Sequence, residues 1–260
     1  MTSVKRTRLK IVIALGLSAL ALMAFFLIWW WRPGEDLEAW RSGPAPATWA
    51  AWTHQEELWN SQGLARQVEH DYVPIGGISL ELQLAVLVSE DIDFFGHGAV
   101  DTRAVREALE EWMEGSRLRG ASTISQQLAR TLFLSPERSL WRKLREARLA
   151  WWLERRLGKR RIFELYLNMV EFGPGLMGAQ AASCEYYGIA ADSLPPEAAA
   201  GLAAVLPSPG RDNPVTASDL WHLRRETILR RMWAADWLRH KLELLNEYGT
   251  GVPRDAQVGE

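Results

Sequence analysis

The feature that most constrains this chain is a continuous apolar stretch near its N-terminus, Ile11–Trp31. About twenty such residues in a helix match the hydrocarbon thickness of a bilayer. A secretory signal has a shorter apolar segment and a small-residue cleavage site. This stretch instead ends in Trp29, Trp30 and Trp31, and tryptophan favours the membrane interface. We therefore predict an uncleaved transmembrane anchor over residues 11–31, with a cleaved signal as the alternative.

Basic residues are concentrated on one side of this stretch. Four cations precede it, at Lys5, Arg6, Arg8 and Lys10, whereas only Arg32 follows closely. Positive charge beside an anchor is usually retained in the cytoplasm. We therefore expect a single-pass protein with residues 1–10 as a cytoplasmic tail and the rest of the chain on the outer side of the membrane. A substrate used there must bring its own activation, because ATP is not available.

The composition of the 260-residue chain is that of a folded protein, with 48% hydrophobic and 24% charged residues. The net charge of −2 gives no electrostatic reason to expect nucleic-acid binding. The single cysteine, Cys184, excludes an intrachain disulfide and a cysteine zinc cluster. We expect Cys184 to be a small buried residue.

Beyond the anchor, the pattern is helical nearly to the end of the chain, with no convincing strand. Residues 32–70 are predicted to be a juxtamembrane linker and lead-in, whose Trp49, Trp52 and Trp59 either rest on lipid or cover the core. Residues 71–248 are predicted to be one domain, and residues 249–260 a C-terminal tail. The predicted helices cover 80–88, 101–116, a stretch from Ser135, 160–167 and 197–206, and residues 221–248 lie against either the core or the membrane.

The helix expected from Ser135 has two different faces. At helical spacing, one face carries an apolar stripe from Leu140 through Leu144 to Trp151, which we expect to pack on the core. Arg138, Arg142 and Glu146 recur on the opposite face. Such a charged row is usually a solvated surface, but its neighbours in the sequence favour a site.

Glu90 is the first candidate catalytic group. It ends the apolar helix 80–88 and precedes the pair Phe94 and Phe95. A positioned acid of this kind is a candidate general base, and a surface acid at a helix end is the alternative. His97, which follows, is more readily explained as a residue that orients loops or bonds Asp101 than as a proton carrier.

A second group of polar residues follows a glycine at Gly120. It contains uncharged donors and then a series of cations: Ser122, Thr123, Gln126, Gln127, Arg130, Arg138, Arg142 and Lys143. Hydroxyls and amides donate to sugar and phosphate oxygens, and guanidinium groups pair well with pyrophosphate. Glu146 would fix these cations or hold a divalent metal. A salt-bridged surface helix does not explain the uncharged donors.

Long ordered motifs support this interpretation: YVPIGGISLELQLAVLVSED, EDIDFFGHGAVD, GASTISQQLARTLFLSPERSLWRKLREA, KRRIFELYLNMVEFGPGLMGAQAA and LPPEAAAGLAAVLPSPGRDNP. Over about Tyr72–Pro214 they resemble the family 51 peptidoglycan glycosyltransferases, and most closely the monofunctional biosynthetic transglycosylases. The resemblance implies a mostly α, lysozyme-like, bilobal glycosyltransferase domain behind one transmembrane helix, with its second lobe against a bacterial cytoplasmic (inner) membrane and the domain in the periplasm.

The resemblance also implies a reaction and a set of residue roles. The enzyme would polymerise lipid II into β-1,4 glycan strands with inversion. Glu90 would remove the proton of the acceptor's 4-hydroxyl, and Glu146 would be the second acid, at the pyrophosphate site. The implied substrate-binding positions are Asp91, Phe94, His97, Ser122, Thr123, Gln126, Gln127, Arg130, Arg138, Arg142 and Lys143. No cofactor is required with certainty, and Mg²⁺ or Mn²⁺ at Glu146 stays open. The partners implied are lipid II, the growing strand and the membrane, with other cell-wall synthases or division proteins as further candidates.

Two positions depart from the family pattern. Arg130 stands where the family usually has Lys, and Ala99 where it tends to have Gly. Arg keeps its charge but does not readily give up a proton. The sequence contains no Ser-x-x-Lys or Lys-Thr-Gly motif, so we expect glycan strands without cross-linking. Two alternatives remain: a lytic muramidase, which also uses two acids, and a catalytically weak scaffold that binds lipid II.

Overall fold

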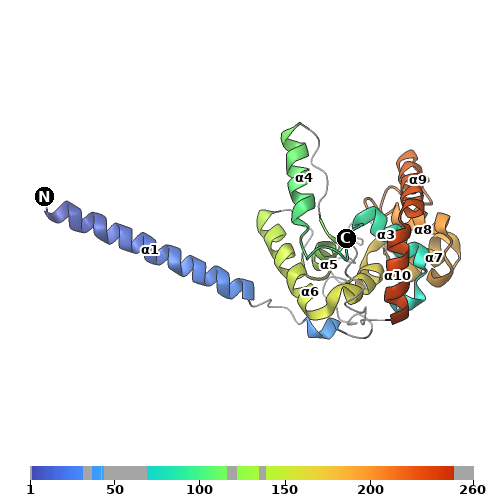
Figure 1. Cartoon of the computed structure of the whole chain (residues 1–260), viewed down its shortest axis with the longest axis horizontal. Helices are drawn as coiled ribbons and strands as arrows, with labels where there is room; N and C mark the ends of the chain where they lie inside the picture. Colours follow the sequence, from blue (N-terminus) through green and yellow to red (C-terminus); the bar gives the residue numbers. More distant parts are fainter. Residues whose placement is uncertain are drawn as a thin grey trace. The chain divides into compact units, whose positions relative to one another are not determined.

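The computed structural model describes residues 2–31, 37–41, 43, 69–115, 122–134 and 139–248. The chain divides into two units, of which the first is the helix α1 (Thr2–Trp31) and the second begins at Leu37 (Figure 1). In α1, the segment Ile13–Trp30 is long and apolar enough to cross a membrane. The chain thus has one N-terminal apolar helix suited to a single membrane anchor, as predicted.

Part of the predicted linker belongs to the folded unit. The short 3₁₀ helix η1 (Glu38–Trp40) follows Leu37, and both Leu37 and Trp40 are buried. The Trp40 ring packs edge-on against Phe133, with 6.0 Å between the ring centroids. The guanidinium of Arg161 also donates to the Trp40 carbonyl oxygen. The tryptophans predicted to touch lipid or core, at 49, 52 and 59, lie outside the described residues.

The central helix of the folded unit is α3 (Leu80–Glu90), which confirms the predicted helix 80–88. Its N-cap Ser79 accepts a hydrogen bond from the backbone of Leu82, and residues 82–88 are all buried. It packs against α8 (Pro196–Ala203), α9 (Asp219–Ala234) and α10 (Asp236–Tyr248). Each fully buried aliphatic side chain contributes roughly 1.5–3 kcal/mol, so α3 is a rigid base for the acid at its C-terminus.

The second layer is the pair α5 (Ile124–Phe133) and α6 (Leu140–Met169), which pack along each other (Figure 1). The helix begins at Leu140 with Ser139 as its N-cap, not at Ser135 as predicted. Residues 135–138 lie outside the described part. Gly158, with φ of 76°, breaks the helical geometry of α6 and divides it into two helical segments.

The prediction for the packing face of α6 was wrong for its first turns, although Trp151 at the other end of the stripe packs against the core. Leu140 and Leu144 are 88% and 47% exposed, whereas Glu146 on the charged row is 0% exposed. Helical periodicity identifies an apolar stripe but not what covers it. Here the inward face of the first turns is polar because it supplies part of the candidate site.

A small sheet joins distant parts of the chain. Its three strands are β1 (Glu69–His70), β2 (Glu171–Gly173) and β3 (Leu176–Met177), in the order β1-β3-β2. β1 pairs parallel to β3, and β2 pairs antiparallel to it. These strands were not predicted, because two or three residues are too few to show alternation.

The remaining helices lie partly in and partly outside the core. They are α4 (Thr102–Met113) and α7 (Ala179–Tyr187), with the 3₁₀ helices η2 (Ile75–Gly77) and η3 (Ala191–Ser193). The tail helices α9 and α10 lie against the core rather than standing apart, since Trp221, Met232 and Leu242 are buried. Cys184 is exposed, not buried as expected, because it lies on the outer side of α7.

Candidate active site

Glu90 is the last residue of α3 and is half-buried. Its Oε2 accepts a hydrogen bond from the Gln127 side-chain amide at 2.9 Å, and its Oε1 accepts one from the Ser89 hydroxyl at 3.1 Å. The rigid helix α3 fixes the backbone of the acid, and these two donors fix its carboxylate. Its remaining exposure leaves room for a reacting group.

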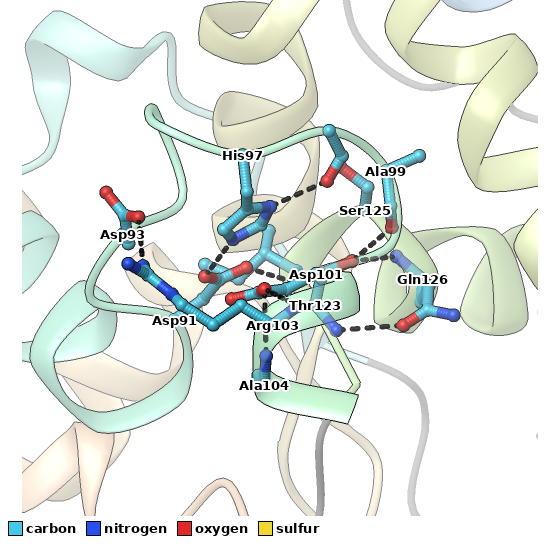
Figure 2. A network of polar contacts seen from close by, with 12 residues as sticks. Asp91, Asp93, His97, Ala99, Asp101, Arg103, Ala104, Thr123, Ser125 and Gln126 are labelled. Carbon is cyan, nitrogen blue, oxygen red and sulfur yellow. Dashed lines mark hydrogen bonds and ion pairs between the residues drawn. The ribbon is translucent and has the colours of Figure 1, made fainter. Parts of the chain in front are cut away.

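The loop after Glu90 is held by a network around His97 (Figure 2). The Asp91 carboxylate contacts His97 Nε2 at 2.6 Å with one oxygen and accepts from the Ile124 backbone at 2.9 Å with the other. His97 Nδ1 lies 2.6 Å from the carbonyl oxygen of Gly98. Asp91 therefore ties the end of α3 both to this loop and to the start of α5.

His97 faces two acceptors, a carboxylate and a carbonyl, so both ring nitrogens can donate when the imidazole is protonated. Burial alone would lower the pKa of His97, but the hydrogen bonds to Asp91 and Gly98 outweigh it and raise that pKa. The expectation that His97 orients loops agrees with this geometry. Its partner is Asp91, however, and not Asp101, which instead accepts from the backbone of Arg103 and Ala104 at the start of α4.

A capping box begins α5. The Thr123 hydroxyl accepts from the Gln126 backbone, and the Gln126 side chain accepts from the Thr123 backbone. The same hydroxyl donates to the carbonyl oxygen of Ala99 at 2.7 Å (Figure 2). Thr123 and Gln126 are buried, as is Phe94, which packs against Phe163. These three predicted substrate contacts thus lie in the framework of the site, while Ser122 and Gln127 are partly exposed.

The second acid is enclosed by cations. Arg142 Nη1 donates to Glu146 Oε2 at 3.0 Å, and the Lys143 ammonium donates to Glu146 Oε1. Lys143 also donates to the Ser122 hydroxyl at 2.7 Å. The buried Nε of Arg142 has no hydrogen-bond partner within the described part of the chain. The cluster of Arg142, Lys143 and Glu146 carries a formal charge of +1.

The first turn of α5 connects the two acids. Gln127 in that turn bonds Glu90, and Ser122, just before it, bonds the cation that holds Glu146. Arg130 is exposed in the last turn of the same helix. Arg138, the remaining predicted cation, lies outside the described residues. One short helix therefore places Glu90, held by its hydrogen bonds, and the positive cluster around Glu146 close together in the fold.

The surroundings of Glu146 do not fit a divalent metal. Both carboxylate oxygens already accept hydrogen bonds from cations, which would repel a metal ion. Over the described ranges, no three His, Cys, Asp or Glu side chains converge as a metal site. The geometry thus favours the other predicted role for Glu146, in which it fixes the cations.

Comparison with known proteins identifies the family. A family model described as transglycosylase matches residues 55–233, a range that contains both acids and the cations. The chain belongs to this transglycosylase family. Its fold class, mostly helical with a lysozyme-like transglycosylase domain, is therefore as predicted.

Several relatives are named biosynthetic peptidoglycan transglycosylases. The one from Janthinobacterium sp. (strain Marseille) is 37% identical over 227 residues, which are 86% of this chain and 94% of the relative. The one from Azoarcus sp. (strain BH72) is 41% identical over 196 residues, 75% of this chain and 84% of the relative. The one from Methylobacillus flagellatus is 48% identical over 143 residues, 55% of this chain and 62% of the relative.

The sequence did not single out Tyr166. This residue lies in the second half of α6, is buried, and donates from its hydroxyl to Gln127 Oε1 at 3.0 Å. Its place in the apolar run around Leu165 and Leu167 gave no sign of a polar task. The available signal was a hydroxyl between two leucines, since a buried tyrosine hydroxyl usually needs a partner.

Proposed function

We propose that this chain is a peptidoglycan glycosyltransferase that polymerises lipid II into β-1,4 glycan strands. The family and the names of its relatives supply the reaction class. The observation that carries the proposal is the joint placement, by the first turn of α5, of the anchored acid Glu90 and the positive cluster at Glu146. An acid and a phosphate-binding cluster are the two parts that glycosyl transfer from a pyrophosphate donor requires.

In this mechanism Glu90 is the general base. Its carboxylate takes the proton of the acceptor's 4-hydroxyl while that oxygen attacks C1 of the donor sugar from the face opposite the leaving group. The new C1–oxygen bond forms as the bond from C1 to the pyrophosphate breaks, so the configuration at C1 inverts. Polyprenyl pyrophosphate leaves with the electron pair of the broken bond.

The cations stabilise the charge that develops on the leaving group. Lys143 is 43% exposed at its side chain, so it can turn toward a pyrophosphate oxygen. The Nε of Arg142, which has no partner among the described residues, is a second donor. Arg130 adds exposed positive charge nearby, and Arg138 is a further candidate. Preorganised cations of this kind favour the transition state.

We also propose that the catalytic unit works on the outer surface of the bacterial inner membrane. The basic residues before α1 favour a cytoplasmic N-terminus. Exposed apolar side chains lie on α4, at Val105, Leu109 and Met113, and at the start of α6. Such surfaces are costly to leave in water and suit contact with lipid, where the polyprenyl chain of the substrate resides.

Product analysis separates this function from the alternatives. The full-length protein in detergent is incubated with labelled lipid II, and the products are separated by size. A polymerase gives a ladder of glycan chains that the glycosyltransferase inhibitor moenomycin abolishes. A muramidase would leave lipid II unpolymerised and shorten preformed glycan strands, and a scaffold would bind lipid II and change neither. Either of these results would refute the proposal.

A further inference from the structure

A chain of hydrogen bonds runs from the core to the candidate base. The Tyr166 hydroxyl donates to Gln127 Oε1 at 3.0 Å, and Gln127 Nε2 donates to Glu90 Oε2 at 2.9 Å. Both distances are those of well-formed hydrogen bonds. These two hydrogen bonds connect three helices, because Tyr166 lies on α6, Gln127 on α5 and Glu90 on α3.

The chemistry of the groups fixes the direction of each bond. An ionised carboxylate only accepts, so Gln127 must turn its NH₂ group toward Glu90. The amide oxygen of Gln127 then faces Tyr166, whose hydroxyl must donate. Burial first, and then the nearby negative charge of Glu90, raises the pKa of Tyr166 well above its ordinary value of 10.0, so the hydroxyl keeps its proton.

Tyr166 is well placed to hold this orientation but not to touch substrate. It is buried, and its neighbours Leu165 and Leu167 are buried as well. Gln127, by contrast, is partly exposed, and an amide there could rotate by half a turn. A rotated amide would point its oxygen at the carboxylate and repel it. The fixed hydroxyl disfavours that orientation, because it would then lose its acceptor.

We infer that Tyr166 is a positioning residue of the reaction, acting through Gln127 to hold the Glu90 carboxylate in the orientation that receives the acceptor's proton. The inference rests on the proposed role of Glu90 as base. Small displacements of a catalytic group reduce rates strongly, and a misplacement of 1 Å can cost about a hundredfold. Loss of the Tyr166 hydroxyl should therefore lower turnover without removing any substrate contact.

The test compares two tyrosine variants in the full-length protein. Tyr166→Phe deletes the hydroxyl and keeps the ring, and Tyr187→Phe deletes another buried hydroxyl, which has no hydrogen-bond partner within the described residues. With lipid II as substrate, we expect Tyr166→Phe to lower kcat by about ten- to a hundredfold with little change in KM. Tyr187→Phe should leave both constants at wild-type values. Unchanged kcat in Tyr166→Phe, or a loss confined to KM, would overturn the inference.

A double-mutant cycle distinguishes a positioning role of Tyr166 from a purely structural one. Gln127→Met removes the amide that connects Tyr166 to the base. If Tyr166 acts only through that amide, adding Tyr166→Phe to Gln127→Met should cause no further loss of kcat. If the kcat losses of the two single variants instead multiply in the double variant, Tyr166 does not act through Gln127. The cycle applies even if Tyr166→Phe lowers the melting temperature, because all variants are compared below their unfolding transitions.

Failure of the inference can be distinguished from failure of the proposed function. Glu90→Gln is assayed beside the tyrosine variants. If Glu90→Gln keeps wild-type turnover, the base assignment fails whatever Tyr166 does. If Glu90→Gln is inactive and Tyr166→Phe is fully active, the base stands and the positioning role of Tyr166 is wrong.

Discussion

Replacing Glu146 with glutamine tests the buried cluster that the structure places at the start of α6. The carboxylate is 0% exposed and accepts hydrogen bonds from Arg142, 17% exposed at its side chain, and from Lys143. Glutamine keeps the size of the side chain but removes the charge. Two cations then lose their counter-charge, and one of them remains largely buried.

The expected cost follows from this burial. Removing one partner of a buried ion pair destabilises a protein by about 3–5 kcal/mol, because the remaining charge is left uncompensated. Lys143 is nearly half exposed and can return to water, so we expect Glu146→Gln to cost about 3 kcal/mol, at the low end of that range. In a domain of this size each 1 kcal/mol lowers Tm by roughly 2–4 °C, so the expected decrease is about 6–12 °C.

Thermal unfolding of the full-length protein in detergent, followed by circular dichroism, measures this decrease. The control is Glu110→Gln, which removes an exposed i,i+4 partner of Arg106 at 3.7 Å. Exposed pairs contribute little to stability, so this variant should melt with the wild type. A Glu146→Gln protein that also melts with the wild type would refute the view that the acid is needed to hold the cations.

Four further predictions follow from other parts of the structure. Because the pKa of His97 is raised in the folded protein, the protonated imidazole stabilises the fold below about pH 6.5. This contribution is lost as pH rises through the folded pKa. The melting temperature of the wild type should therefore exceed that of His97→Gln by more at pH 5 than at pH 9. Arg130→Lys should retain or raise polymerisation, since the positive charge is kept. Gly178→Ala should destabilise the fold by at least about 2 kcal/mol, because φ is +82° and a Cβ would lie 2.5 Å from the Asn168 carbonyl oxygen, and urea unfolding measures the change. Leu140→Gln should leave the melting temperature unchanged but, in a protein shortened to residues 32–260 to remove the anchor helix, weaken binding to phospholipid vesicles, as measured by flotation.

Each of these predictions has a control and a contrary result. If the difference in melting temperature between the wild type and His97→Gln increases from pH 5 to pH 9, the protonated form of His97 does not stabilise the fold. Total loss of activity in Arg130→Lys would mean that the site is built around the guanidinium. Gly98→Ala, where a Cβ meets no atom within 4 Å, should be tolerated, and equal losses at the two glycines would contradict the steric argument. If Leu140→Gln floats with vesicles to the same extent as the protein with Leu140, the start of α6 does not contact lipid.

Sequence patterns predicted the parts of the fold that are set by local periodicity. The apolar run of α3 is buried on all sides, and the Pro-opened Ala-rich helix α8 is equally buried. The acid Glu90 could be placed at a helix end because Leu80–Val88 fixes where that helix lies. These features depend on neighbours within a few residues, which a sequence shows.

Features that depend on distant partners could not be predicted in this way. The stripe at Leu140 and Leu144 has helical spacing, but only the fold shows that none of the described elements buries these two side chains. His97 has several carboxylates within reach in the sequence, and the direction of the chain after α3 selects Asp91. The contact of Tyr166 with Gln127 spans 39 residues, so no local pattern reveals it.

Glycan synthesis by the wild type and by Glu90→Gln, measured side by side with labelled lipid II, tests the role of Glu90 as the base. The control is Glu81→Gln, at the other end of the same helix, where the carboxylate pairs with Arg239. We predict polymer from the wild type and from Glu81→Gln, and unconsumed lipid II from a Glu90→Gln protein that melts at the wild-type temperature. Polymer formed by Glu90→Gln at the wild-type rate would contradict the mechanism.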